Sequence, residues 1–310
     1  MFNQRSQAFS LFTFLVFVLS HQAILFSQID KPESLIDGLS IELFSSEPDI
    51  VTPTGIAVDK NGRVFCIESH THFRPKDYAG PKTDRIRIYD DTNGDGKADK
   101  VPNFFEGSTA TMNMAFAPDG SLYVASRSQI FRLRDKNNDD KADENTIIID
   151  LQTKGDYPHN GLSGLAFDEV GKMYFGFGEN LGVDYKLIGT DGTTLSGGGE
   201  GGNIYSCDLE GKKLKRIATG FWNPFGLSFD KVGNLFAIDN DPDWRPPCRL
   251  LHIVEGGDYG YRFSLGRRGT HPFTAWFGEL PGTLGLVSGT GEAPSGILRY
   301  DPMSKSKNES

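Results

Sequence analysis

The sequence predicts an all-β chain folded as a β-propeller, with four nearly complete blades and part of a fifth. Two observations predict it: a hairpin phrase that recurs along the chain, and an excess of glycine. The 310 residues include 37 Gly and 16 Pro, and glycine at about twice its usual share indicates many tight turns between short strands. Long helices are disfavoured, because each interior Gly costs up to about 1 kcal/mol relative to Ala.

The recurring phrase begins at residues 54, 112, 163 and 225, where the chain reads TGIAVDKNGRVF, MNMAFAPDGSLY, SGLAFDEVGKMY and FGLSFDKVGNLF. Each copy is an alternating apolar segment, an Asp-x-x-Gly or Pro-Asp-Gly turn, and a second apolar segment. Alternation of period two around such a turn is typical of a β-hairpin. Residues 295–300 (SGILRY) begin a fifth copy.

Further strands are expected in the intervals between the hairpins, at residues 85–89 (RIRIY), 129–133 (QIFRL), 202–207 (GNIYSC) and 249–254 (RLLHIV). A hairpin plus two more strands, repeated at this spacing, is the pattern of propeller blades. A single blade cannot bury both of its faces, so we expect the blades to stack around an axis. A β-sandwich is the alternative fold, but it does not explain the regular recurrence.

The first 28 residues differ in kind from the rest. Arg5 gives a positive start, and residues 11–19 (LFTFLVFVL) form a short apolar run. This run is shorter than the ~20 residues that span a membrane and fits a signal-peptide core. We therefore expect a signal peptide over 1–28, a propeller over 38–302 and a polar tail over 303–310. We expect a periplasmic or secreted location; an uncleaved membrane anchor is the alternative.

The charge and the cysteines limit the partners. The net charge of −9 argues against nucleic acid, whose phosphates are bound by Lys and Arg. It fits metal binding or simple solubility. Cys66, Cys207 and Cys248 are odd in number, which allows at most one disulfide in an exported protein, and their spacing matches no zinc or haem motif. We expect buried, unpaired thiols.

Two Asp-rich loops predict bound calcium. Residues 91–99 (DTNGDGKAD) place oxygen-bearing side chains at loop positions 1, 3, 5 and 9, with a glycine at position 6. Calcium takes six to eight oxygens, and the glycine allows the turn that brings them together. Residues 135–143 (DKNNDDKAD) repeat the spacing with Asp140 in place of the glycine. The expected ligands are Asp91, Asn93, Asp95, Asp99, Asp135, Asn137, Asp139 and Asp143. Both loops follow predicted strands, so we expect a structural role at blade edges; a solvated acidic turn is the alternative.

Four stretches carry a family resemblance. They are residues 159–180 (HNGLSGLAFDEVGKMYFGFGEN), 220–226 (GFWNPFG), 256–261 (GGDYGY) and 294–296 (PSG). In this order they resemble the motifs of the soluble quinoprotein glucose/sorbosone dehydrogenase family. The resemblance covers about residues 50–302, and the motifs are specific only when taken together.

The resemblance implies a six-bladed-type propeller that binds pyrroloquinoline quinone and calcium at the mouth of its central channel and oxidises the anomeric hydroxyl of aldoses. His159 matches the histidine that takes the hydroxyl proton, and Glu179 stands where the family has the Asp that orients it. A neutral imidazole with a pKa near 6.5 is a suitable base at neutral pH. Asn223 matches a cofactor-contacting Asn. A surface-loop histidine is the alternative reading of His159.

Two departures from the family bear on activity. Trp222 stands where the family has an Arg that neutralises cofactor carboxylates; a Trp could stack on the quinone but supplies no charge. The polar tail after residue 302 stands where the family has its sixth blade. The sequence therefore predicts either a truncated product or a second chain that completes the propeller.

A second resemblance covers residues 68–90 (ESHTHFRPKDYAGPKTDRIRIYD). This stretch looks like the propeller module of large secreted proteins described as membrane-bound dehydrogenases. Glu68, His70 and His72 end a predicted hairpin and could ligate a metal or line the channel mouth. Residues 239–244 (DNDPDW) occupy the same position in the fourth hairpin. We expect Glu68, His70, Asp239 and Trp244 to contact substrate.

Three functions remain open on the sequence. The first is a quinone-dependent dehydrogenase for a sugar or polyol, with an external electron acceptor. The second is a non-catalytic, calcium-stabilised propeller that binds a glycan or a protein. The third is a calcium-dependent lactonase-type hydrolase, whose central metal would be held by Glu68, Glu179, Asn223 and Asp239. His159 with Glu179 favours the first function, whereas Trp222 and the absent blade favour the second.

Overall fold

A computed structural model describes residues 32–300 of the chain. The chain divides into two compact units, residues 1–43 and a second unit that starts at Phe44. Residues 32–43 of the first unit contain no helix or strand. Every described strand lies in the second unit, with one short 3-10 helix at Phe263–Leu265. Within the described range, no helix has the length and apolar character needed to cross a membrane. The predicted signal peptide and polar tail lie outside the described residues.

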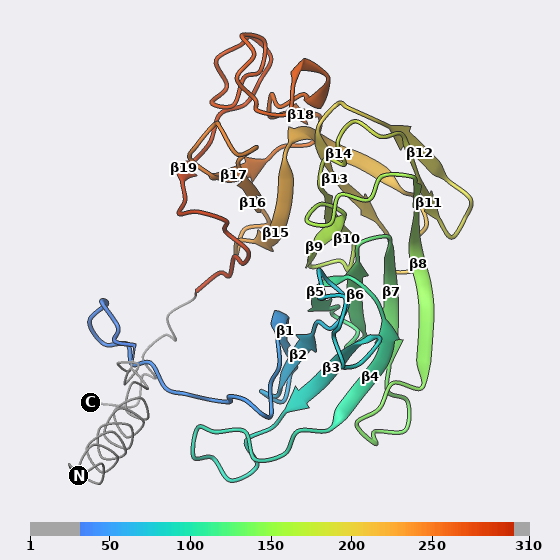
Figure 1. Ribbon diagram of the computed structural model, residues 1–310, viewed down its shortest axis with the longest axis vertical. Coiled ribbons are helices and arrows are strands. Elements are labelled where there is room, and N and C mark those ends of the chain that lie inside the picture. The colour runs from blue at the N-terminus through green and yellow to red at the C-terminus, as the bar shows by residue number, and fades with distance from the viewer. Residues whose placement is uncertain (1–31, 301–310) are drawn as a thin grey trace, which may run out of the picture. The chain divides into compact units, whose positions relative to one another are not determined.

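The second unit is a propeller of four sheets that follow one another in chain order (Figure 1). Each blade runs outward from an inner strand, and its strands are antiparallel except for one short parallel pair, β14 with β18. The inner strands are β1 (Pro53–Val58), β5 (Thr111–Phe116), β9 (Leu162–Phe167) and β15 (Asn223–Phe229). The all-β propeller predicted from the sequence is confirmed.

The remaining strands complete the four blades. Blade 1 adds β2 (Val64–Glu68), β3 (Asp84–Tyr89) and β4 (Asn103–Ser108). Blade 2 adds β6 (Leu122–Ser126), β7 (Gln129–Arg134), β8 (Glu144–Thr153), β11 (Tyr185–Gly189) and β12 (Thr194–Gly197). Blade 3 adds β10 (Met173–Phe177), β13 (Gly202–Cys207), β14 (Lys215–Phe221) and β18 (Gly257–Asp258). Blade 4 adds β16 (Leu235–Asn240), β17 (Arg249–Ile253) and β19 (Ser288–Gly289).

The four copies of the phrase form the hairpins of the inner and second strands, as expected. In the first copy the Asp59 side chain accepts hydrogen bonds from the backbone N–H groups of Asn61 and Arg63, both at 2.9 Å. Gly62 follows with φ 84°, a conformation that costs glycine no steric strain. In this turn the Asp side chain therefore binds backbone N–H groups, and the Gly adopts the positive φ that the turn requires.

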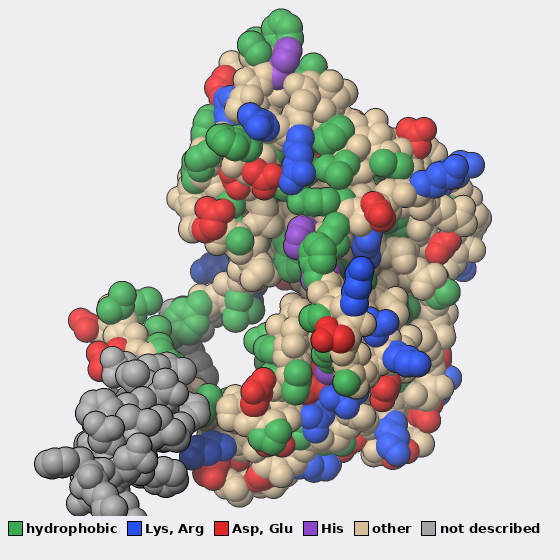
Figure 2. All heavy atoms as spheres, in the orientation of Figure 1, with side chains coloured by type: hydrophobic (Ala, Val, Ile, Leu, Met, Phe, Trp, Pro, Cys, Tyr) green, Lys and Arg blue, Asp and Glu red, His purple; other side chains and the backbone are tan. Residues whose placement is uncertain are grey.

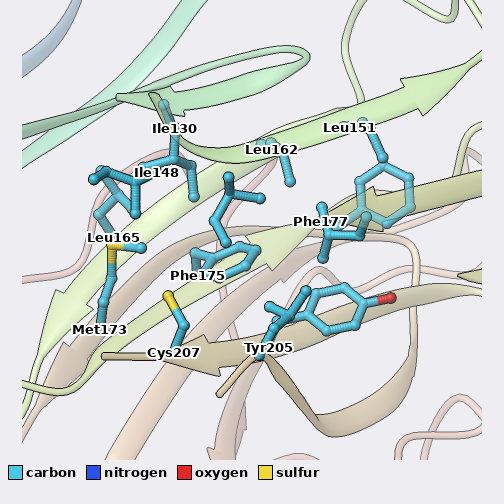
Figure 3. Close-up of a cluster of buried hydrophobic side chains, with 14 of the residues drawn as sticks. Ile130, Ile148, Leu151, Leu162, Leu165, Met173, Phe175, Phe177, Tyr205 and Cys207 are labelled. Carbon is cyan, nitrogen blue, oxygen red and sulfur yellow. The ribbon is translucent and has the colours of Figure 1, made fainter. Parts of the chain in front are cut away.

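The hydrophobic core lies at the interfaces between successive blades. Period-two alternation in the strands turns one set of side chains toward each neighbouring blade. Figure 3 shows the core between blades 2 and 3, where Ile130 of β7 and Phe175 of β10 are fully buried. The three cysteines are buried and unpaired, which confirms that prediction.

The expected fifth copy does not form a strand. Residues 295–300 have no regular structure, and residues 295–299 instead line a channel of about 750 Å³ together with the four inner strands. An inner strand is held by hydrogen bonds to the second strand of its own blade. The last strand within residues 32–300 is β19 (Ser288–Gly289), so no hairpin forms at residues 295–300.

Candidate functional site

A cavity of about 510 Å³ lies at the channel mouth, where the inner strands begin. Its wall includes residues at or next to the N-terminal ends of β1, β5, β9 and β15, together with the segment 292–295. On the face drawn in Figure 2, hydrophobic and histidine side chains lie together near the middle of the propeller. Of the residues that the sequence suggested for the site, His72, His159, Trp222 and Asn223 line this cavity.

His159 lies in the loop before β9 and its side chain is exposed. Its ring centroid is 5.5 Å from that of Tyr157 and 5.5 Å from that of His72. The backbone carbonyl of His159 accepts a hydrogen bond of 3.2 Å from the Asn223 side chain. An exposed imidazole with aromatic neighbours, facing a cavity, can accept a proton from a bound hydroxyl.

Glu179 does not hold His159. Its carboxylate is buried and accepts hydrogen bonds from the backbone N–H groups of Gly182 at 2.6 Å and Gly201 at 3.0 Å. Burial raises the pKa of this carboxyl, and the two N–H donors oppose the rise. No hydrogen bond joins Glu179 to His159 among the described residues, so the structure gives Glu179 a role in fixing the loops after β10 and β12.

Trp222 and Asn223 are positioned by a buried ion pair. Asp239 accepts hydrogen bonds from the backbone N–H groups of Trp222 at 3.1 Å and Asn223 at 2.7 Å. Its other oxygen pairs with Arg249 at 2.6 Å, and both side chains are fully buried. Asp239, expected to contact substrate, instead lies behind the cavity wall and orients the residues that form it.

The positively charged side chain of Arg267 lies beside Trp222. The guanidinium of Arg267 is 5.7 Å from the Trp222 ring centroid and 5.3 Å from that of Tyr157. It also pairs with the exposed carboxylate of Asp243 at 2.7 Å. Arg267 lies just after the 3-10 helix Phe263–Leu265, so no sequence spacing marks it as a neighbour of Trp222.

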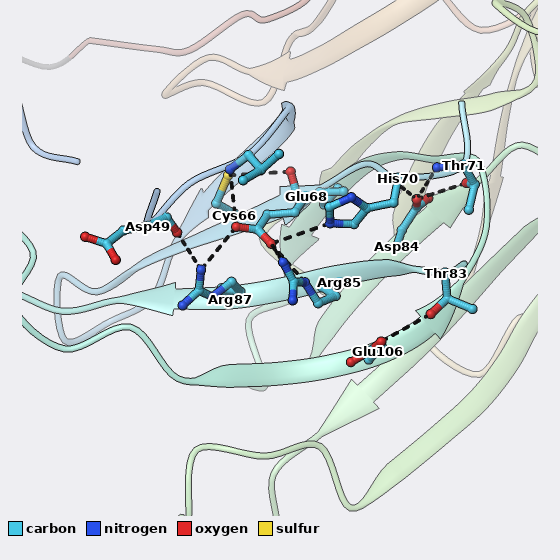
Figure 4. A network of polar contacts seen from close by, with 12 residues as sticks. Asp49, Cys66, Glu68, His70, Thr71, Thr83, Asp84, Arg85, Arg87 and Glu106 are labelled. Carbon is cyan, nitrogen blue, oxygen red and sulfur yellow. Dashed lines mark hydrogen bonds and ion pairs between the residues drawn. The ribbon is translucent and has the colours of Figure 1, made fainter. Parts of the chain in front are cut away.

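Glu68 and His70 lie inside blade 1 rather than on the cavity wall (Figure 4). Glu68 is fully buried, with Arg85 at 2.6 Å and Arg87 at 3.3 Å. The His70 ring is hydrogen-bonded to the Tyr78 hydroxyl at 2.6 Å. The structure therefore gives both residues a structural role, because burial among these partners leaves them no access to substrate. Only His72 of this motif reaches the cavity.

Part of the cavity wall is acidic. It is formed by Asn240, Asp241, Asp243 and Glu292. Burial raises the pKa of Asp241, and the negative charges of Glu292 and Asp243 raise it further. Trp244, expected to contact substrate, does not line the cavity; it is exposed and stacks with Arg268 at 4.5 Å.

Both Asp-rich loops join the third strand of a blade to its fourth, at the blade edge. In the first loop, Asp91 accepts hydrogen bonds from the backbone N–H groups of Gly94 at 2.7 Å and Gly96 at 2.8 Å. Asp135 does the same for Asn138 at 2.7 Å and Asp140 at 3.0 Å.

The two loops share one backbone conformation. Asn138 and Asp140 have φ values of 59° and 66°, where the first loop has Gly94 at 78° and Gly96 at 84°. The second loop thus keeps the shape of the first without its glycines. Within residues 32–300, no three His, Cys, Asp or Glu side chains are grouped closely enough to hold a metal, so calcium binding by these loops stays a prediction.

The lactonase-type metal site expected as an alternative does not assemble. Glu68 and Asp239 are held by arginines, and Glu179 by backbone N–H groups. A carboxylate that is already neutralised by a buried arginine is a poor cation ligand. Of the four expected ligands, only Asn223 lines the cavity.

Several residues on or beside the cavity wall were missed in the sequence. Tyr157 and Asn160 precede β9, and Arg267 follows the 3-10 helix. Asn240 and Asp241, at the end of β16 and directly after it, lie in the segment 239–244 that was expected at the channel mouth. Asn160 is buried and donates a hydrogen bond of 2.6 Å to the Glu179 carbonyl. Its place directly after His159, before an inner strand, is the one signal that could have identified it.

Four blades around a channel, with a cavity at the start of the inner strands, define the chain as a β-propeller. The chain is similar to the PQQ-bound form of an aldose sugar dehydrogenase from Streptomyces coelicolor, at 19% identity and a TM-score of 0.54, over 80% of this chain and 71% of that one. It is similar to an oxidoreductase described as a glucose dehydrogenase from Thermus thermophilus, at 18% identity and a TM-score of 0.56, over 81% and 73%.

A third likeness is to the calcium structure of a Trichoderma reesei carbohydrate-active enzyme of family AA12, at 14% identity and a TM-score of 0.53, over 73% of this chain and 59% of that one. At these identities the likeness establishes the propeller fold, which confirms the fold expected from the sequence motifs. No curated protein matches the chain. The chain belongs to the family described as Domain of unknown function (DUF7133), whose model matches residues 34–253.

Proposed function

We propose that this protein is an exported oxidoreductase that removes hydrogen from a hydroxyl group of a sugar or polyol bound in the channel-mouth cavity. The observation that carries the proposal is the position of His159, exposed on the wall of that cavity and surrounded by aromatic rings. The propeller fold shared with sugar dehydrogenases supports it.

His159 acts as the proton acceptor in this proposal. A neutral imidazole has one free acceptor nitrogen and can take the proton of a hydroxyl that lies within hydrogen-bonding distance. Tyr157 packs on its ring, and the Asn223 side chain holds its backbone carbonyl. These contacts fix the loop, so that the imidazole faces the cavity without Glu179.

The fold class implies pyrroloquinoline quinone, a planar quinone with three carboxylates, and one side of the cavity fits it. Trp222 lines the cavity although it is only 3% exposed, and the buried Asn223 Oδ1 has no hydrogen-bond partner within the described residues. Arg267 adds a positive charge beside Trp222. When bound, the quinone would accept the two electrons and the hydrogen removed from the substrate carbon. Trp222, Asn223 and Arg267 would hold it.

The acidic wall sets a condition on this binding. Asp241 and Glu292 would repel the carboxylates of the quinone unless a cation lay between them. Calcium is therefore included in the proposal, both here and in the two Asp-rich loops. The N-terminal apolar segment supports export to the periplasm or beyond, with a sugar or polyol as substrate and an external electron acceptor.

The test is sugar oxidation by the purified chain, supplied with pyrroloquinoline quinone, calcium chloride and an artificial acceptor dye. We expect turnover of an aldose, and a loss of at least about 100-fold in kcat for His159→Gln. His252→Gln is the matched control, because His252 is exposed on the strand β17 and should leave kcat unchanged. Sugar binding without turnover would favour the non-catalytic glycan-binding propeller instead.

A further inference from the structure

One loop of blade 1 reaches the catalytic candidate of blade 3. The loop follows β2, and its His72 and Phe73 rings lie 5.5 Å and 5.0 Å from the His159 ring, measured between centroids. His72 lines the same cavity as His159. Two imidazoles from different blades therefore face one space at the channel mouth.

The base of this loop is held by a buried carboxylate. Asp84, the first residue of β3, is fully buried and accepts hydrogen bonds from the backbone N–H groups of His70 at 2.7 Å and Thr71 at 3.0 Å. Its second oxygen accepts one of 2.9 Å from the N–H of Thr111, in the inner strand β5. Figure 4 shows Asp84 below His70 and Thr71. Through these hydrogen bonds, Asp84 of blade 1 connects Thr71, which directly precedes His72, to the inner strand of blade 2.

The tip of the loop is strained and exposed. Phe73 has φ 48°, a left-handed conformation that costs a bulky residue about 1–3 kcal/mol. The residue is 66% exposed, and its ring contacts the rings of His72 and His159. Such strain is found where a surrounding structure holds a residue in place for function.

We propose that His72 binds the substrate hydroxyl that neighbours the one acted on at His159, and that Asp84 is its positioning residue. This inference rests on the proposed function and gives its substrate class: a sugar or polyol with two adjacent hydroxyl groups. Phe73 supplies an apolar surface for the carbon skeleton beside the two imidazoles.

The electrostatic surroundings suit this role. Burial lowers the pKa of His72, the charges of His159 and Arg127 lower it further, and Asp84 opposes them. A lowered pKa favours the neutral form of the His72 imidazole. A neutral imidazole both donates and accepts a hydrogen bond, as a hydroxyl group does.

The test compares glucose with 2-deoxyglucose, which lacks the hydroxyl next to the anomeric one. Binding of each to the full chain is measured by calorimetry in calcium chloride, with and without pyrroloquinoline quinone. We expect the chain to prefer glucose roughly five-fold, the worth of one hydrogen bond, and we expect His72→Ala to abolish this preference. Asp84→Asn should reduce the preference, and His252→Ala should leave it unchanged.

The outcomes separate this inference from the proposed function. If His72→Ala keeps its melting temperature and still prefers glucose as the parent chain does, the role of His72 is wrong while the proposed function stands. If the folded parent chain binds neither sugar under either condition, the proposed function is wrong and the role of His72 falls with it.

Discussion

The guanidinium of Arg267 lies over the ring of Trp222, 5.7 Å from its centroid, at the edge of the channel-mouth cavity. The glucose/sorbosone dehydrogenase motif has an arginine where this chain has Trp222, and the sequence alone suggested that the charge was lost. The structure places the positive charge of Arg267 beside Trp222, from a part of the chain 45 residues further on. Trp222 lines the cavity, and Arg267 places a positive charge next to its ring.

Arg267→Ala should weaken the binding of pyrroloquinoline quinone by about ten-fold. A charge-assisted hydrogen bond to a carboxylate contributes about 1.5–3 kcal/mol, part of which Asp243 already takes up. Quenching of tryptophan fluorescence by added quinone measures the change. Arg268→Ala is the matched control, since Arg268 stacks on the exposed Trp244; an equal loss in both variants would contradict the assignment.

Asp239→Asn should destabilise the chain by about 3–5 kcal/mol, because it leaves the fully buried Arg249 without a counter-charge. It should also loosen Trp222 and Asn223, whose backbone N–H groups donate hydrogen bonds to Asp239. Urea unfolding measures the free energy.

Asp243→Asn provides the comparison, since it breaks an exposed pair with Arg267 at 2.7 Å. Exposed pairs contribute about 0.2–1 kcal/mol. If the two variants were equally stable, Asp239 would not be the organising residue of the cavity wall.

Calcium should raise the melting temperature by about 5 °C when it is in large excess over its dissociation constant. The effect should fall when Asp91 or Asp135 is replaced by Asn, since these residues begin the two loops. Glu169→Gln, in an exposed hairpin turn, should respond to calcium as the parent chain does. Differential scanning calorimetry with calcium chloride and with EGTA makes the measurement, and an unchanged melting temperature would exclude calcium from the loops.

Asp140 should give a stability that depends on pH. Its pKa lies below the usual value of 3.8, chiefly because Lys100 donates a hydrogen bond to it, with Arg63 adding a second. A depressed pKa stabilises the fold at pH values above 3.8, and this contribution is lost as the pH falls through the folded-state pKa.

Asp140→Asn should therefore cost about 0.5 kcal/mol at neutral pH, and its difference from the parent chain should vanish at acidic pH. Urea unfolding of both chains across this range tests the prediction. A difference that stayed constant with pH would mean that the carboxylate charge is not what joins the second loop to blade 1.

Much of the fold could be predicted from the sequence because blades are local. A hairpin with an Asp-x-x-Gly turn is determined by neighbouring residues, as Asp59 and Gly62 show, and its repetition sets the architecture. The strand predicted from residue 295 does not form. A strand must pair with a second strand, and the sequence of one segment does not show whether a second strand lies beside it.

The site could be predicted only in part. His159, Trp222 and Asn223 were placed on the cavity wall by motif order, because they lie next to inner strands. The burial of Glu68 and Asp239 was missed, since it depends on arginines from the neighbouring strand of each sheet, Arg85 and Arg249. The contact between Arg267 and Trp222 was also missed. Arg267 lies in a turn, and a turn shows no repeating pattern from which its neighbours in space could be predicted.

The most direct test of the account is a titration of the purified chain with pyrroloquinoline quinone in calcium chloride, followed by tryptophan fluorescence. The account predicts saturable quenching with a dissociation constant of about a micromolar or tighter, reversed by EGTA, because Trp222 lines the cavity and a cation must offset its acidic wall. A chain that melts cooperatively and yet shows no quenching would contradict the account and leave a propeller without a quinone site.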